Sequence, residues 1–112
     1  MYVRRSSEGY REAAPGVALR SLSHGDGTHL VEFRLSGGYE LPTHAHPNEQ
    51  TGYLVSGRIR LRIGAAEQEM SPGDSWSVPP GVEHGATILE DSIAVEVFSP
   101  PRTDLLPADD LA

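Results

Sequence analysis

The stretch GYELPTHAHPNEQTGYLVSG, residues 38–57, and the stretch GDSWSVPPGVEH, residues 73–84, are the most informative parts of this chain. Each block begins with glycine, and together they contain three of the five histidines. The side chains in them that suit a metal ion are His44, His46, Gln50 and His84. Imidazole nitrogens combined with a side-chain oxygen fit a first-row divalent ion, namely zinc, iron, nickel, cobalt or manganese. The two blocks therefore predict a site for one divalent transition metal ion.

Length and composition limit what such a site can belong to. The chain has 112 residues, enough for one domain and too few for two. Cysteine is absent, which excludes disulfides, thiolate ligands and a cysteine nucleophile. Lysine is absent as well, so all nine Lys/Arg positions are arginine and Schiff-base chemistry on a lysine is excluded.

The charge balance and the hydropathy pattern narrow the choice of partners. A formal net charge of -7 argues against a nucleic-acid surface, which needs a basic face. No apolar run is long enough to span a bilayer, and Arg4-Arg5 lacks the hydrophobic segment of a secretion signal. We expect a cytoplasmic protein that binds neither nucleic acid nor a membrane.

The hydrophobic period along the chain is two rather than 3.6, and Gly, Pro, Asn and Asp recur at short intervals, which is typical of an all-β sandwich or barrel. No segment predicts a helix. The first sixteen residues and residues 103–112 lack a sustained pattern, and we expect an arm and a tail there. The predicted strands are Val17–Leu22, His29–Leu35, Gln50–Val55, Arg58–Ile63, Glu67–Met70, Ser75–Val78, Gly85–Leu89 and Ile93–Phe98.

The alternation is clearest in the segment RIRLRI, residues 58–63, where arginine and aliphatic side chains take opposite faces. A turn at Gly64 and Ala65 would return the chain as a hairpin. We expect the arginines to lie on a solvated face and to pair with Glu67 and Glu69 across the hairpin, rather than to form an anion-binding stripe.

The spacing of the histidines has a simple structural reason. In an extended strand, residues two apart point to the same face, with Cα atoms roughly 6.6 Å apart, so His44 and His46 can converge on one ion. Parity places Gln50 on that side as well. A bend at Pro47 and Asn48 leaves Glu49 as the alternative oxygen ligand. His84 follows the rigid turn Pro79-Pro80-Gly81, and closure of a β-barrel would bring it to the same interior.

These two blocks resemble the paired motifs of the cupin superfamily, across His44-x-His46 to Gln50 and Gly57, and from Gly73 through Pro79 and Gly81 to His84. The resemblance implies a single all-β domain over residues 1–112, a small cupin-type double-stranded β-helix or jelly-roll barrel, with the ion near its mouth. It also implies a homodimer, which would protect exposed strand edges. The chain departs from many cupins in having Gln50 where they have Glu.

The segment VEVFSPPRTDL, residues 95–105, is similar to the closing strand of the pectin-degradation cupins, which convert 4,5-unsaturated uronates to linear keto forms. This resemblance implies active-site roles for Glu96, Phe98 and Arg102. Two departures from that group are Glu96 in place of Asp and a gap between His46 and Gln50 that is one residue shorter.

The expected function is Lewis-acid proton chemistry on a small anionic sugar acid. Three neutral imidazoles and an amide leave the full dipositive charge on the ion, which attracts anions and polarises a bound oxygen. In this hypothesis Glu96 moves protons, and Arg102 clamps the substrate carboxylate. Phe98 forms an apolar wall, and Tyr53 and Trp76 line the pocket.

Two other functions remain open at this point. One is a metal-dependent dioxygenase, and the other is a barrel that binds or senses a small ligand without turnover. His24 and His29 have no assigned role, although His29 shares parity with Val31, Phe33 and Leu35 and so faces the inner rim.

Overall fold

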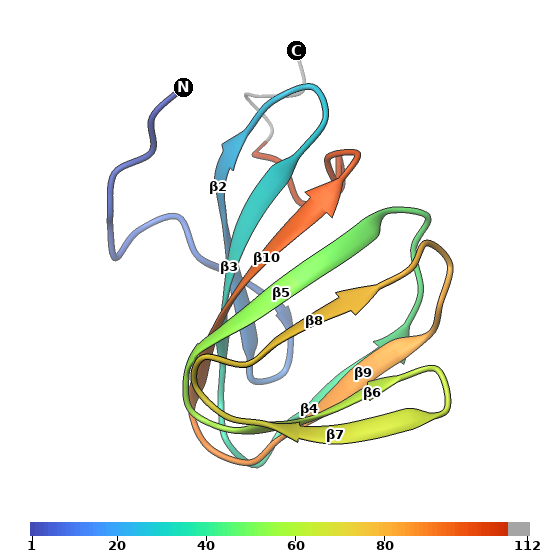
Figure 1. Ribbon diagram of the computed structural model, residues 1–112. Helices are drawn as coiled ribbons and strands as arrows, with labels where there is room; N and C mark the ends of the chain where they lie inside the picture. Colours follow the sequence, from blue (N-terminus) through green and yellow to red (C-terminus); the bar gives the residue numbers. More distant parts are fainter. Residues whose placement is uncertain (108–112) are drawn as a thin grey trace.

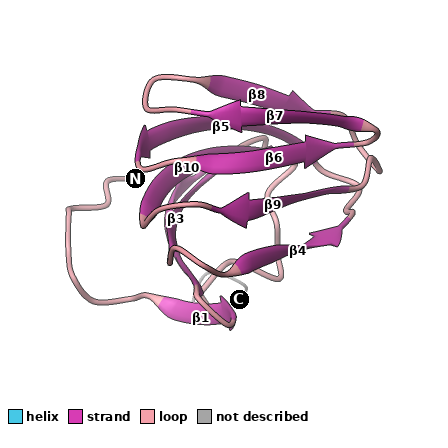
Figure 2. Cartoon of the chain, turned by 90° about the horizontal axis from the view of Figure 1, so that it is seen from below, coloured by secondary structure: helices cyan, strands magenta, loops and turns pink. Residues whose placement is uncertain are grey.

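In the computed structural model, which describes residues 1–107, ten antiparallel β-strands form two facing sheets (Figures 1 and 2). No helix occurs in this range, and accordingly none is present that is long and apolar enough to cross a membrane. One sheet contains, in order, β1 (Arg11–Ala14), β2 (Val17–His24), β3 (His29–Leu35), β10 (Ser92–Ser99), β5 (Glu49–Ser56) and β8 (Ser75–Val78). The other contains β4 (Glu40–His44), β9 (His84–Ile88), β6 (Ile59–Ile63) and β7 (Ala66–Met70). The predicted all-β jelly roll is confirmed.

Alternation along each strand decides which side chains enter the space between the sheets. In β5 the buried positions are Gln50, Gly52 and Leu54, and the residues between them are exposed. In β10 the inward positions include Glu96 and Phe98. The aliphatic part of the core is formed by Val17, Leu35, Leu54, Ile59, Leu61, Val78, Ala86, Ile88 and Ala94, packed with Trp76. Each large aliphatic side chain buried in this way stabilises the fold by about 1.5–3 kcal/mol.

All eight predicted strands are present with small shifts in their bounds, and two further strands were not predicted. β1 pairs with β2 of the same chain, so part of the expected N-terminal arm belongs to the larger sheet, while the residues before it run outside the two sheets (Figure 2). β4 was not predicted as a separate strand. The expected tail also begins later than predicted, because Leu105 is buried with Leu19, Val31 and Phe98. The rest of that tail, residues 108–112, lies outside the described residues.

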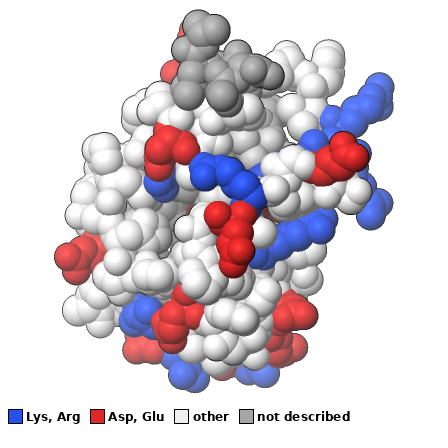
Figure 3. All heavy atoms as spheres, turned by 180° about the vertical axis from the view of Figure 1, so that it is seen from behind, with Lys and Arg blue, Asp and Glu red and all other residues white. Residues whose placement is uncertain are grey.

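The arginine-rich face behaves as predicted. Arg58 contacts Glu69, and Arg60 lies within 3.8 Å of Glu67 across the β6–β7 hairpin. Arg62 instead pairs with Glu40 of β4, at 3.2 Å. These pairs are largely exposed and contribute little to stability, although they offset like-charge repulsion. On the face drawn in Figure 3, basic and acidic side chains likewise lie next to one another.

Position 57, in the turn between β5 and β6, requires glycine for two reasons: its backbone conformation is left-handed, and neighbouring atoms leave no room for a side chain. Its φ is +87°, and an added Cβ would lie 2.1 Å from Ser92 Oγ and 2.4 Å from the Asp91 carbonyl oxygen. Gly73 has a similar φ of +95° but nothing within 4 Å of the same position. A side chain at Gly73 would therefore cause backbone strain alone, whereas a side chain at Gly57 would cause both backbone strain and steric overlap.

We predict that Gly57→Ala destabilises the protein more than Gly73→Ala. Gly73→Ala should lower the free energy of unfolding by about 1–3 kcal/mol from strain alone. Gly57→Ala should lose about 1–3 kcal/mol more, because backbone atoms must shift to accept the methyl group. Urea unfolding of both variants measures the difference, and equal losses would contradict it.

Candidate metal centre

His44 and His84 face one another across neighbouring strands. The two residues are directly paired between β4 and β9, and their ring centroids are 4.2 Å apart. The register shifts between Leu41 and His44, so β4 carries one extra residue there. Residues three apart in a regular strand point to opposite faces, and the bulge cancels that inversion. As a result, both Leu41 and His44 line the interior.

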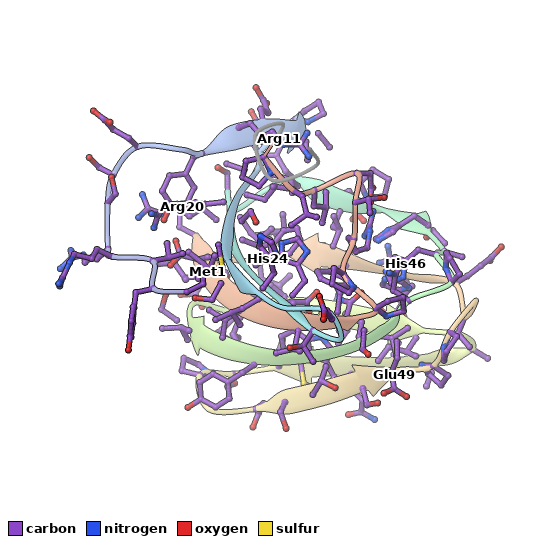
Figure 4. All side chains as sticks on the ribbon, turned by 90° about the horizontal axis from the view of Figure 1, so that it is seen from above. Met1, Arg11, Arg20, His24, His46 and Glu49 are labelled. Atoms are coloured by element: carbon purple, nitrogen blue, oxygen red, sulfur yellow. The ribbon has the colours of Figure 1, made fainter. Side chains whose placement is uncertain are left out.

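His46 completes the histidine set from the connection between β4 and β5, not from a strand. Its ring centroid is 4.9 Å from that of His84 and 5.7 Å from that of His44. The three histidines each offer a ring nitrogen, and these nitrogens all lie within 4.8 Å of one another. His46 is only 9% exposed and lies at one end of the barrel interior, whereas the exposed Glu49 points away from it (Figure 4).

The hydrogen bonds of the three imidazoles orient their lone pairs. Each Nδ1 lies 2.8–3.0 Å from a backbone carbonyl oxygen, that of Pro42 for His44, Asn48 for His46 and Val82 for His84. A carbonyl oxygen only accepts, so each Nδ1 carries the hydrogen and each Nε2 presents a lone pair. Such backing hydrogen bonds are the usual partners of metal-binding imidazoles.

Burial keeps two of these rings neutral. It lowers the pKa of His46, and it lowers the pKa of His84 to about 4, so both are uncharged at neutral pH. The Nε2 atom of His84 is buried and has no hydrogen-bond partner within the described residues. A buried lone pair without a partner is costly unless a cation or a donor meets it.

Gln50 strengthens the case for a cation. Its Oε1 lies 2.9 Å from His46 Nε2, and its Nε2 donates to Glu96 Oε2 in a short contact. Since the Nδ1 of His46 holds the ring hydrogen, two acceptor atoms face each other in a buried space. That arrangement is repulsive unless a positive charge lies against both atoms. The donor set of three imidazoles and one amide oxygen therefore fits a divalent ion.

Glu96 is a buried carboxyl group beside this set. It is 7% exposed, and its Oε1 accepts a hydrogen bond of 2.7 Å from Trp76 Nε1 while Oε2 accepts from Gln50. Burial raises the pKa of Glu96 to about 7, although the hydrogen bond from Trp76 and the charge of Arg102 act in the opposite direction. The group therefore exchanges its proton near neutral pH.

Gly52 provides the space in which Trp76 and Glu96 meet. A Cβ at this position would lie 2.2 Å from Trp76 Nε1 and 2.3 Å from Glu96 Oε1. Gly52 is paired with both residues across the sheet, with Glu96 on one side and Trp76 on the other. Any side chain here would separate the carboxyl group from the indole.

The site opens into a cavity of about 260 Å³ between the two sheets. Its wall is mostly apolar, and its ionisable and amide lining residues are His44, His84, Gln50, Glu96 and Arg102. Trp76 also lines the cavity. A small apolar space with a few convergent polar groups is the usual form of a small-molecule site.

The remaining predicted residues lie in different places. Arg102 reaches the cavity, but its guanidinium also forms an ion pair with Asp104. Phe98 is 1% exposed and packs beneath His46 and Arg102 without lining the cavity, so it supports the site from behind. Tyr53 is 48% exposed on the outer face of β5, and the structure does not place it where we predicted, because its parity is opposite to that of Gln50.

Sequence reasoning missed supporting residues. Asn48 is buried, and its backbone carbonyl oxygen accepts a hydrogen bond from His46. Its side-chain nitrogen donates a hydrogen bond of 2.6 Å to the Pro100 carbonyl oxygen. Asn48 therefore connects the segment after β10 to a proposed metal ligand. His29 is fully buried and its Nδ1 accepts from the backbone N–H of Arg102. The parity of His29 indicated an inward position, whereas nothing in the sequence pattern distinguished Asn48 from an ordinary turn residue.

Comparisons with known proteins agree with this geometry. The family model described as a cupin domain matches residues 31–99. The chain is 24% identical over 99 residues to the pectin degradation protein KdgF of Dickeya dadantii, covering 87% of this chain and 90% of that protein. It is 34% identical over 95 residues to an H2HPP isomerase of Bacillus subtilis, covering 82% of this chain but only 40% of that protein.

The solved structure of KdgF from Halomonas sp. superposes with a TM-score of 0.88 at 28% identity, covering 95% of this chain and 98% of that one. The family match spans more than half of the sequence and includes all three histidines of the site. The chain therefore belongs to the cupin domain family.

Proposed function

We propose that this protein is a divalent-metal-dependent cupin that ketonises a small sugar acid of the 4,5-unsaturated uronate type. The observation that carries the proposal is the buried carboxyl group of Glu96, joined through Gln50 to the three-histidine set and open to a cavity that Arg102 also lines. This combination supports a site in which a proton carrier, an ion and an anion partner would surround one small space.

The ion would be held by His44, His46, His84 and the Oε1 atom of Gln50. When bound, a divalent ion supplies a Lewis acid that polarises a substrate oxygen, and four neutral ligands leave its charge undiminished. The backbone carbonyls behind the imidazoles fix the tautomer that such binding requires.

Glu96 would transfer the proton. Conversion to the linear keto form breaks the bond between C1 and the ring oxygen, turns the C1 hydroxyl into an aldehyde and the ring oxygen into a C5 ketone, and adds a proton to C4. The proton lost by the C1 hydroxyl balances the one gained by C4, so no other reactant is consumed. A carboxyl group with a pKa of about 7 accepts and returns a proton at neutral pH without a large energetic penalty in either direction. Trp76 and Gln50 hold both oxygens of this group in place, which limits the directions in which it can act.

The size and charge of the cavity favour a single sugar acid. A volume of about 260 Å³ suits a monomer rather than a polymer chain. Arg102 is the only cationic side chain that lines this cavity among residues 1–107, and a guanidinium pairs with a carboxylate in a bidentate manner. The similarity to two KdgF proteins, one named for pectin degradation, supports the same substrate class.

Protein purified without chelators should contain about one divalent metal ion per chain, and His46→Ala should lose most of it. Removing one of four ligands leaves an incomplete site, whereas His24→Ala, a histidine outside the set, should keep its metal. Elemental analysis of the three proteins measures this. Metal retained by His46→Ala would contradict the ligand assignment.

Glu96→Gln should keep the metal but lose at least about 100-fold in kcat on 4,5-unsaturated galacturonate, because the amide cannot carry the proton. Glu49→Gln, an exposed change on the neighbouring strand β5, is the control and should be fully active. Loss of the substrate's ultraviolet absorbance follows the reaction. If wild type binds metal and sugar acid but shows no turnover, the protein is a binding cupin and the catalytic proposal is wrong.

The homodimer stays a prediction, and the outer face of β5 and β10 gives it support. Tyr53, Val55 and Val97 are 37–48% exposed on these neighbouring strands and form an apolar surface that a second copy would cover. Tyr53→Glu combined with Val55→Glu should then shift the protein from dimer to monomer in analytical ultracentrifugation. A monomeric wild type at micromolar concentration would contradict the prediction.

A further inference from the structure

The guanidinium of Arg102 is held by the carboxylate of Asp104 in a two-point contact. Arg102 Nε lies 3.1 Å from Asp104 Oδ1, and Nη2 lies 2.6 Å from Oδ2. The two partners differ in exposure, with 15% for the Arg102 side chain and 62% for that of Asp104. Arg102 lines the cavity, whereas Asp104 does not. Asp104 therefore lies on the solvent side of the guanidinium, outside the space that a substrate would enter.

The contact with Asp104 leaves some of the N–H donors of Arg102 free for a substrate. A guanidinium has five N–H donors, and Asp104 accepts from the one on Nε and from one on Nη2. The two donors on Nη1 and the second one on Nη2 remain. One N–H of Nη1 and the second N–H of Nη2 point in the same direction and form another edge of the guanidinium, which can bind a second carboxylate in a bidentate manner. A substrate carboxylate can thus bind Arg102 without displacing Asp104.

The segment that carries both residues is fixed at several points. The Arg102 backbone N–H donates to His29, and the Arg102 carbonyl accepts from the N–H groups of Leu105 and Leu106. Arg11 from β1 donates 2.8 Å to the Asp104 carbonyl. The guanidinium carbon lies 5.2 Å from the centre of the Phe98 ring, which restrains its plane from below. Within this framework the Asp104 contact restricts rotation of the guanidinium.

We infer that Asp104 is a positioning residue that holds Arg102 with its free edge ready for a substrate carboxylate, and so determines the preference of the site for carboxylated over neutral sugars. This inference rests on the proposed function, since it assigns the substrate carboxylate to Arg102. An arginine oriented in advance loses less conformational entropy when it binds, which favours affinity. Asp104 also offsets part of the Arg102 charge, which acts against affinity for an anion, so the sign of the change in affinity on removing Asp104 shows which effect is larger.

The single tryptophan gives a direct binding signal. Trp76 is the only tryptophan in the chain and lines the cavity, so its fluorescence reports occupancy without turnover. The probes are galacturonate, which carries the carboxylate, and its methyl ester, which has nearly the same shape without the charge. Asp104→Asn should weaken galacturonate binding about tenfold and change methyl ester binding less than about twofold.

Two further variants make the result specific. Asp104→Glu keeps a carboxylate that can reach the fork and should restore most of the galacturonate affinity. Asp26→Asn removes the same charge from the β2–β3 turn, away from the cavity lining, and should behave as wild type. On 4,5-unsaturated galacturonate, Asp104→Asn should raise KM about tenfold with little change in kcat, as expected for lost carboxylate binding.

The possible outcomes distinguish this inference from the proposed function. Tighter galacturonate binding by Asp104→Asn would mean that Asp104 competes with substrate, and equal weakening of both probes would mean a merely structural role; either overturns the inference. A wild type with no preference for galacturonate over its methyl ester overturns it as well. If wild type prefers galacturonate through Asp104 but turns over no unsaturated uronate, the proposed reaction fails and the positioning role stands.

Discussion

The side-chain amide of Gln50 is the contact on which the rest of the site depends. Its oxygen faces His46, and its nitrogen donates to Glu96, so one planar group joins the three-histidine set to the buried carboxyl group. The amide cannot be reversed without placing an N–H where the proposed ion would bind and a lone pair against Glu96. The direction of one hydrogen bond therefore determines that the amide oxygen faces the three-histidine set and the amide nitrogen faces Glu96.

The burial of Glu96 explains several neighbouring residues. A carboxyl group inside a barrel is costly unless both oxygens have donors, and here those donors are Gln50 and Trp76. The indole can approach only because Gly52 has no side chain. The sheet order β10-β5-β8 places these three positions side by side, with Gly52 in the middle. The local fold and the chemistry of the carboxyl group are thus consequences of one strand arrangement.

Much of the fold and of the histidine set could be predicted from the sequence, because strand parity and motif spacing both depend on local pattern. The failures have physical causes. The bulge between Leu41 and His44 inverts parity without a change in composition. β4 ends at His44 and His46 lies in the connection to β5, so a regular strand through both histidines was the wrong local picture. Tyr53 was assigned to the pocket although its own parity places it outside. Asn48 acts through a contact with Pro100, which lies 52 positions away in the sequence and is brought close only by the tertiary fold. Asp104 acts through Arg102, only two positions away.

The same geometry explains why residue 50 is glutamine where many cupins have glutamate. A carboxylate there would have no N–H for Glu96, and two buried carboxyl groups in contact would have to share one proton. That would raise the proton affinity of the pair, and at low pH the proposed ion would lose one ligand. The amide avoids both effects, since it donates to Glu96 and remains neutral at every pH. Gln50 and Glu96 are therefore complementary: the amide nitrogen of Gln50 needs an acceptor in this buried position, and the carboxyl group of Glu96 provides it.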